Sequence, residues 1–201
     1  MIDGFYRFAR GLVHGIFGAL YRVRYHGLEN IPQGGGYVLC SNHISQKDPI
    51  FIALKVPGQI CYMAKAELFK FKPLGFIISH LGTFPVERGK GDTGAIDAAG
   101  ERIRQGKILG IFPEGTRSKD GKLQRLKSGA IVVAAQTGAD ILPVIVSGPK
   151  KLKIFTRVDV TYGKMIKNSD LGLTDIHAPS QLRAAKKVLT EQMQALWESA
   201  Q

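Results

Sequence analysis

Short apolar runs alternate along this chain with segments whose apolar residues recur at helical spacing. Runs rich in β-branched and aromatic residues predict strands. They fall at Tyr37–Ser41, Gln59–Ala64, Thr83–Val86, Ile108–Phe112, Ile141–Val146 and Ile154–Tyr162. Helices are predicted at Pro49–Lys55, at Glu67–Leu81 with a break near Pro73, at Asp92–Gln105, at Ser128–Gln136 and from a capping Ser180 onward.

This alternation predicts a single layered α/β domain, with a mixed, mostly parallel sheet flanked by helices. Thr156 and Thr161 make the last predicted strand partly polar, so we expect it at an edge of the sheet. The length of 201 residues suits one domain with a sizeable core.

Residues 1–24 differ from the rest of the chain. Aromatic and aliphatic residues recur there on one helical face, while Arg7 and Arg10 lie on another. That pattern is typical of a helix lying in a membrane interface. We therefore predict an N-terminal amphipathic anchor over 1–24 and a second domain over 25–201. The alternative is a helix packed on the protein's own core.

Charge narrows the choice of partners. The net charge of +12 indicates an anionic partner: nucleic acid, an anionic membrane surface or a phosphorylated substrate. Cys40 and Cys61 lie in apolar runs and fit a reducing compartment, without a zinc pattern. We find no convincing secretory signal and no apolar run long enough to span a bilayer, so we expect a cytosolic protein or one that lies on a membrane.

His43 and Asp48 are the first candidates for chemistry. On a regular helix their five-residue step would turn through roughly 500° and hold the side chains about 140° apart, so contact requires a turn. Pro49 favours that turn, because the residue before a proline is pushed out of the helical region. We expect Asp48 to cap a helix starting at Pro49. The alternative is an ordinary capping aspartate beside a loop histidine.

A second candidate group follows the predicted strand at Ile108–Phe112. Residues 112–118 read FPEGTRS, so a carboxylate, a glycine, a hydroxyl and a guanidinium emerge together where open α/β sheets bind ligands. Arg117 suits a phosphate. Lys65 and Arg88 also follow apolar runs, and the three cations would converge on one anion. The alternatives are a surface turn and solvated charges.

Four ordered segments resemble the glycerolipid acyltransferases, and most closely the bacterial 1-acyl-sn-glycerol-3-phosphate (lysophosphatidate) acyltransferases. They are Asn42-His43 with Asp48, GTFPVER at residues 82–88, FPEGTRS at 112–118 and ILPV at 141–144. A histidine and an aspartate at this spacing occur often by chance, whereas the FPEGTRS segment is specific. The four segments together span residues 42–144.

The resemblance implies an enzyme that moves a fatty acyl group from a thioester to the sn-2 hydroxyl of lysophosphatidate, giving phosphatidate. His43 would be the general base and Asp48 would hold its tautomer, with no acyl-enzyme. The substrate-binding residues would be Lys65, Arg88, Glu114, Gly115, Thr116 and Arg117. Pro143 belongs to a segment associated with donor binding or structure.

The same resemblance implies the partners. We expect no metal and no cofactor beyond the thioester co-substrate, carried by coenzyme A or acyl carrier protein. We place the enzyme on the cytoplasmic face of the membrane, bound peripherally or monotopically to an anionic surface. Alternatives are another lysolipid acceptor or, from a different class, a nucleic-acid-binding module. The module would need aromatics among its surface cations, and here the aromatics sit mostly in apolar runs.

Overall fold

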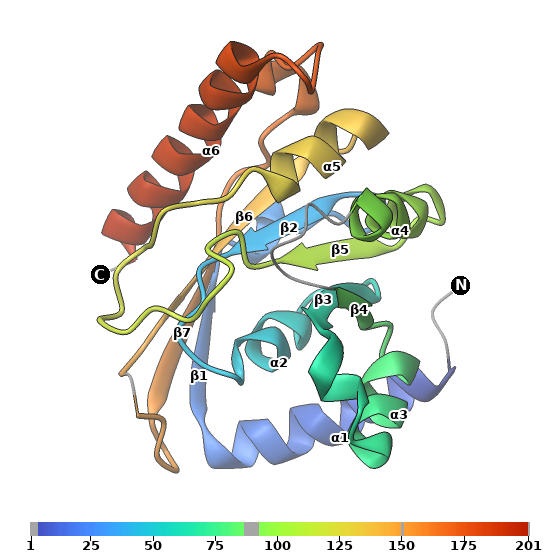
Figure 1. Ribbon diagram of the computed structural model, residues 1–201. Coiled ribbons are helices and arrows are strands. Elements are labelled where there is room, and N and C mark those ends of the chain that lie inside the picture. Colours follow the sequence, from blue (N-terminus) through green and yellow to red (C-terminus); the bar gives the residue numbers. More distant parts are fainter. Residues whose placement is uncertain (1–3, 87–92, 150, 201) are drawn as a thin grey trace.

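The computed structural model describes residues 4–86, 93–149 and 151–200 (Figure 1). Within them, seven strands form one sheet in the order β1-β7-β6-β2-β5-β3-β4. The strands are β1 (Arg22–His26), β2 (Val38–Ser41), β3 (Ile60–Lys65), β4 (Phe84–Val86), β5 (Ile108–Ile111), β6 (Ile141–Ser147) and β7 (Arg157–Tyr162). Only the β6–β7 pair is antiparallel among these described strands, which confirms the predicted mixed, mostly parallel sheet.

Helices cover both faces of this sheet (Figure 1). They are α1 (Gly4–Leu20), α2 (Asp48–Ala53), α3 (Lys72–His80), α4 (Thr93–Arg104), α5 (Gly129–Thr137) and α6 (Pro179–Ser199). Single turns of 3₁₀ helix lie at η1 (Leu28–Asn30), η2 (Ala66–Phe69) and η3 (Asn168–Leu171). The predicted break near Pro73 is present, because η2 ends before α3 begins and Pro73 occupies the first turn of α3.

The alternation of side chains along each strand divides the core in two. Val38 and Cys40 of β2 pack in the cluster that also holds buried residues of α4, α5 and α6. Leu39, between them, packs in the opposite cluster with Phe51 and Ile52 of α2. Successive side chains of a strand point to opposite faces, so each apolar run serves both layers.

The prediction that the last strand lies at an edge of the sheet is wrong. Strand β7 is not an edge strand, because β1 pairs with it in parallel along Arg22–His26. No strand was predicted at β1, whose exposed arginines alternate with half-buried Val23 and Tyr25. The predicted boundary after residue 24 therefore falls inside a strand of the sheet. The final helix also begins at Pro179, one residue before the serine expected to cap it.

Helix α1 packs on the domain through one side. Tyr6 is buried, and its hydroxyl accepts a hydrogen bond from the backbone N–H of Ile60. Arg10, expected on the polar face opposite the lipid-facing one, turns inward and donates to the carbonyl of Val56 at 2.8 Å. The other side of the helix exposes apolar residues, namely Phe5, Phe8, Leu12 and Ile16. In the described part of the chain, no helix combines the length and the apolar character that crossing a membrane requires.

Candidate active site

The predicted site residues that the structure describes gather at the carboxyl edge of the sheet because of strand order and register. Strands β2 and β5 are parallel neighbours, with Cys40 opposite Ile111. His43 and Glu114 each lie three residues beyond these partners, so the two loops leave the sheet side by side. The fold therefore joins two segments that lie about seventy residues apart in the sequence.

His43 and Asp48 are in contact. The ring Nδ1 lies 2.8 Å from Oδ2 of Asp48, and the same oxygen accepts the backbone N–H groups of Ile44 (2.7 Å) and Ser45 (2.8 Å). An oxygen that already accepts two hydrogen bonds favours the tautomer in which Nδ1 carries the proton. The other ring nitrogen, Nε2, then keeps its lone pair. Asp48 is fully buried, whereas 18% of the His43 side chain is exposed, so the ring is accessible to solvent.

The expected capping role of Asp48 is wrong. Helix α2 begins at Asp48 itself, the capping position is Lys47, and no side chain caps the helix. The carboxylate reaches back to Ile44 and Ser45 instead of forward into the first turn. It organises the loop that carries the histidine, as contact across a five-residue step requires.

An aromatic stack supports the histidine ring. The rings of His43 and Phe112 lie 4.1 Å apart between centroids at 22°, and Tyr62 stacks on Phe112 at 5.7 Å. Stacking fixes the ring plane, while the bond to Asp48 fixes its rotation. This role of Phe112 was not predicted, because residue types alone do not show that β5 lies next to β2.

Glu114 and Ser118 attach the FPEGTRS loop to the histidine loop. Oε1 of Glu114 accepts the backbone N–H of His43 at 3.3 Å, and the N–H of Ser118 donates to the His43 carbonyl at 2.7 Å. Both residues are buried. Glu114, predicted to bind substrate, thus contacts the main chain of the histidine, and its substrate role stays a prediction.

Burial also changes the chemistry of Glu114. Loss of solvent disfavours its charged form and raises its pKa to about 7, although the backbone N–H groups of His43 and Gln124 oppose that shift. Oε2 has no hydrogen-bond partner among the described residues. Glu114 is therefore a carboxyl group whose charge is costly, because it is buried and lies near the carboxylate of Asp48.

Asn42 fixes the other side of the histidine loop. Its side-chain amide donates to the carbonyl of Val146 at 3.0 Å and accepts the N–H of Val146 at 2.8 Å. This double hydrogen bond joins the end of β2 to β6 where the strands separate. His43 is consequently held on both sides, by β6 and by the loop after β5.

Gly115, Thr116 and Arg117 form the exposed part of the FPEGTRS loop. Gly115 has a φ of 75°, a conformation that favours glycine. A Cβ placed there would lie 2.7 Å from Nζ of Lys127, so the Lys127 ammonium lies against this glycine. The side chains of Thr116 and Arg117 are exposed. Lys127 was not among the substrate-binding residues predicted from the sequence.

The structure gives less support to a binding role for Lys65 and Arg88, the other two cations predicted to bind substrate. Lys65 is the last residue of β3, at the same edge of the sheet, but it is exposed and pairs with Glu67 at 3.1 Å. Arg88 lies outside the described residues. The convergence of Lys65, Arg88 and Arg117 on one anion stays a prediction.

The site thus has two sets of side chains. The hydrogen-bonded group consists of His43, Asp48, Glu114 and Ser118. The solvent-facing group consists of Thr116, Arg117 and Lys127.

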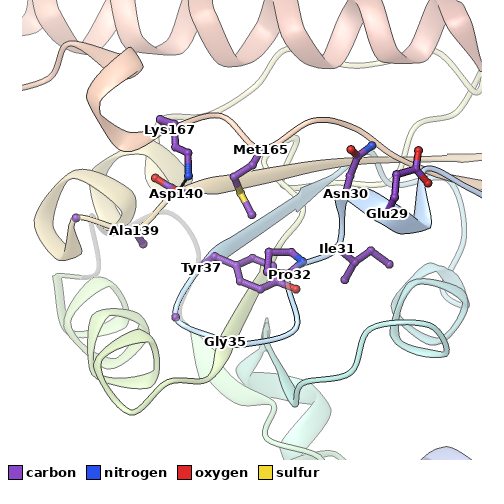
Figure 2. Close-up of a pocket in the computed structure, with 12 residues that line it drawn as sticks. Glu29, Asn30, Ile31, Pro32, Gly35, Tyr37, Ala139, Asp140, Met165 and Lys167 are labelled. Carbon is purple, nitrogen blue, oxygen red and sulfur yellow. Dashed lines mark hydrogen bonds and ion pairs between the residues drawn. The ribbon is translucent and has the colours of Figure 1, made fainter.

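A separate pocket of about 430 Å³ lies at the amino edge of the sheet (Figure 2). Tyr37 lines it just before β2, and Asp140 lines it just before β6. Asp140 pairs there with Lys167 at 2.9 Å. The pocket is therefore at the end of the sheet opposite to His43. The described residues also contain no group of three or more His, Cys, Asp or Glu side chains suited to a metal ion.

Comparisons with known proteins agree with this geometry. A family described as Acyltransferase matches residues 22–147. A 1-acyl-sn-glycerol-3-phosphate acyltransferase from Bacillus subtilis is 30% identical over 184 residues, covering 90% of this chain and 89% of the relative. One from Streptococcus pneumoniae is 32% identical, covering 83% and 64% respectively. This chain also has the same fold as the crystal structure of the 1-acyl-sn-glycerophosphate acyltransferase PlsC from Thermotoga maritima, with a TM-score of 0.78 at 24% identity. The match covers 97% of this chain and 79% of the Thermotoga maritima chain.

Proposed function

The chain belongs to the acyltransferase family, and from this membership and the site geometry we propose that it acylates the sn-2 hydroxyl of lysophosphatidate to give phosphatidate. The observation that carries the proposal is the accessible His43 ring, bonded through Nδ1 to buried Asp48 at the edge where the FPEGTRS loop also emerges. Relatives named for this activity support the choice of acceptor. They favour an enzyme over a nucleic-acid-binding module.

The reaction needs one proton acceptor and one oriented alcohol. Nε2 of His43 takes the proton from the acceptor hydroxyl as its oxygen attacks the thioester carbonyl. Asp48 stabilises the imidazolium that forms. The tetrahedral intermediate then expels the thiolate, which recovers the proton from His43. Because a thioester is already activated, positioning and a base suffice, and no covalent enzyme intermediate is required.

The solvent-facing group supplies the phosphate-binding function. Arg117 offers a planar pair of donors to the phosphate oxygens, and Thr116 adds a hydroxyl donor. Gly115 lets a ligand approach the backbone, and Lys127, lying against that glycine, adds a second cation within the same loop. Arg88 and Lys65 complete the proposed binding set. Glu114, also predicted to bind substrate, holds the loop close to His43 through the backbone N–H of that residue.

We assign the enzyme to the cytoplasmic face of the membrane, where its lipid acceptor lies. The exposed apolar side of α1 supports peripheral attachment through that helix. The net charge of +12 suits an anionic bilayer and equally an acidic acyl carrier protein or the phosphates of coenzyme A. The acyl donor is a thioester of one of these two carriers.

An acyl-transfer assay with purified protein tests the proposal. The acceptors are lysophosphatidate, other lysophospholipids and monoacylglycerol, each offered with coenzyme A and carrier-protein thioesters. We expect lysophosphatidate to give the highest kcat/KM. A higher kcat/KM for another lysolipid would move the function to that acceptor, and no transfer to any acceptor would overturn it.

A further inference from the structure

The loop between β6 and β7 carries two large apolar side chains at its tip. The backbone N–H of Thr156 donates to the carbonyl of Lys153 at 3.1 Å, which closes a four-residue turn with Ile154 and Phe155 at its central positions. These side chains are 63% and 64% exposed. Leu152, in the same loop, packs instead against the core. The tip therefore presents apolar surface that the fold does not use.

The backbone conformation at the tip makes this choice of residue unusual. Phe155 has a φ of 63°, the only positive φ of a non-glycine residue in the described ranges. Glycine or asparagine normally takes that position of a turn, and a bulky side chain there is strained. Neither folding nor solubility favours an exposed aromatic at this place, so an external partner is the natural explanation.

The tip is fixed to the end of α1. The N–H of Phe155 donates to the carbonyl of Leu20 at 2.7 Å, and the N–H of Arg22 donates to the carbonyl of Thr156 at 3.0 Å. Figure 1 shows α1 and this orange loop at the same end of the molecule. The exposed apolar residues of the helix, from Phe8 to Ile16, and those of the loop thus belong to one end of the protein.

The charges around the tip are positive. Lys151, Lys153 and Arg22 are exposed beside it, and Arg157 at the base of the loop pairs with Asp159 at 2.8 Å. Apolar side chains at a tip, surrounded by cations, match the boundary between the acyl chains and the anionic headgroups of a bilayer. A soluble acidic protein would complement the cations but not the two exposed apolar side chains.

We propose that the turn at 153–156 is a second membrane-inserting element, which places Ile154 and Phe155 among lipid acyl chains and holds Lys151 and Lys153 at anionic headgroups. This inference rests on the proposed function, which is the reason to expect that the protein meets a membrane. The turn and α1 together give the enzyme two attachment points. Attachment through one helix would let the enzyme rotate about the helix axis, whereas two points fix the orientation of the enzyme on the bilayer.

Vesicle flotation of the full chain tests the proposal, with vesicles of phosphatidylcholine alone or with added phosphatidylglycerol. The variants are Ile154→Ser, Phe155→Asn and the pair Lys151→Gln/Lys153→Gln. Asparagine accepts a positive φ, so Phe155→Asn removes the ring without adding backbone strain. Leu28→Ser is the matched control, because Leu28 is exposed beyond the opposite end of β1.

We expect Ile154→Ser combined with Phe155→Asn to weaken partitioning about tenfold on both vesicles. The lysine pair should weaken it only on anionic vesicles, about fivefold for each lysine at low salt. Leu28→Ser should bind as wild type. Unchanged flotation of the tip variants, or a wild type that does not float, would overturn the inference.

Activity on detergent-dispersed substrates separates this inference from the proposed function. Tip variants should keep wild-type kcat there, since the tip lies outside the site. A wild type that floats but transfers no acyl group would remove the proposed function and leave the membrane contact standing. Tip variants that float normally but lose kcat/KM only with carrier-protein donors would assign the loop to that protein and overturn the membrane inference.

Discussion

The hydrogen-bonded group spans the segments after β2 and β5, whereas the solvent-facing group lies on the loop after β5 alone, and the two groups are held in different ways. In the first, backbone N–H groups and buried oxygens fix each carboxylate and the histidine ring. In the second, side chains stand in solvent on a loop whose backbone alone is fixed. Rigid placement suits proton transfer, which needs a defined geometry. Exposed cations suit capture of a phosphate that arrives from outside.

The largest expected effect comes from removing the base. His43→Ala should lower kcat about 10³-fold, the range of general base catalysis, while circular dichroism and thermal unfolding stay close to wild type. His177→Ala is the control, because His177 is exposed near the start of α6. Turnover within tenfold of wild type would show that another group takes the proton.

A smaller loss of kcat is expected from Asp48→Asn. The amide oxygen can occupy the place of Oδ2 and accept the same N–H groups, while the amide nitrogen takes the place of Oδ1, which has no described partner. The loop should keep its shape, and only the negative charge beside the imidazolium is lost. We expect kcat to fall about 10²-fold with an unchanged KM for lysophosphatidate. A raised KM with unchanged kcat would place Asp48 in acceptor binding instead.

Glu114→Gln tests the buried carboxyl group through pH. Since its pKa rises from 4.5 to about 7 on folding, the folded protein retains a proton that the unfolded chain has released between those values. Its contribution to the unfolding free energy is therefore present below pH 4.5 and lost as pH rises through about 7, by roughly 3 kcal/mol. Glutamine does not titrate, so the variant should gain about that much relative to wild type between pH 4.5 and 8.

Urea unfolding at both pH values measures this gain, with Glu29→Gln as the control at an exposed carboxylate. A difference between Glu114→Gln and wild type that is the same at both pH values would mean that folding does not shift the pKa of Glu114. The carboxyl group of Glu114 would then ionise like that of an ordinary charged loop residue.

The smallest effect is expected from Lys127→Met, which keeps the apolar stem and removes the charge. We expect the KM for lysophosphatidate to rise about fivefold, with kcat and the donor KM unchanged. Lys122→Met, on the same loop, is the matched control. A larger effect on the donor would assign Lys127 to the carrier's phosphates.

Most of the sheet could be predicted because its central strands are buried on both faces and read as continuous apolar runs. Strand β1 could not, because exposed Arg22 and Arg24 alternate with partly buried residues directly after a helix. Missing β1 also made β7 look like an edge strand, since Thr156 and Thr161 alone cannot reveal what covers that side. Both errors arise because the residues of a strand do not reveal which other strand pairs with it.

The site, too, was predictable except where it depends on which strands are neighbours. The step from His43 to Asp48 and the FPEGTRS segment identified the chemical groups, and the contact at 2.8 Å agrees with the turn that their spacing required. The bonds from Glu114 and Ser118 to the main chain of His43 depend on β2 and β5 being neighbours, which residue types alone do not specify. Stacking of Phe112 under the ring follows from the same adjacency.

The central claim is that the hydrogen-bonded group carries out proton transfer and the solvent-facing group binds the phosphate. One ratio tests it most directly, namely kcat/KM for lysophosphatidate over kcat/KM for monoacylglycerol, which lacks only the phosphate. We expect Arg117→Ala to lower this ratio about tenfold or more, because one charge-assisted phosphate contact is lost. Arg125→Ala on the same loop should leave it unchanged. Asp48→Asn should lower both terms equally and keep the wild-type ratio. A ratio that falls with Asp48→Asn, or stays constant with Arg117→Ala, would contradict the account.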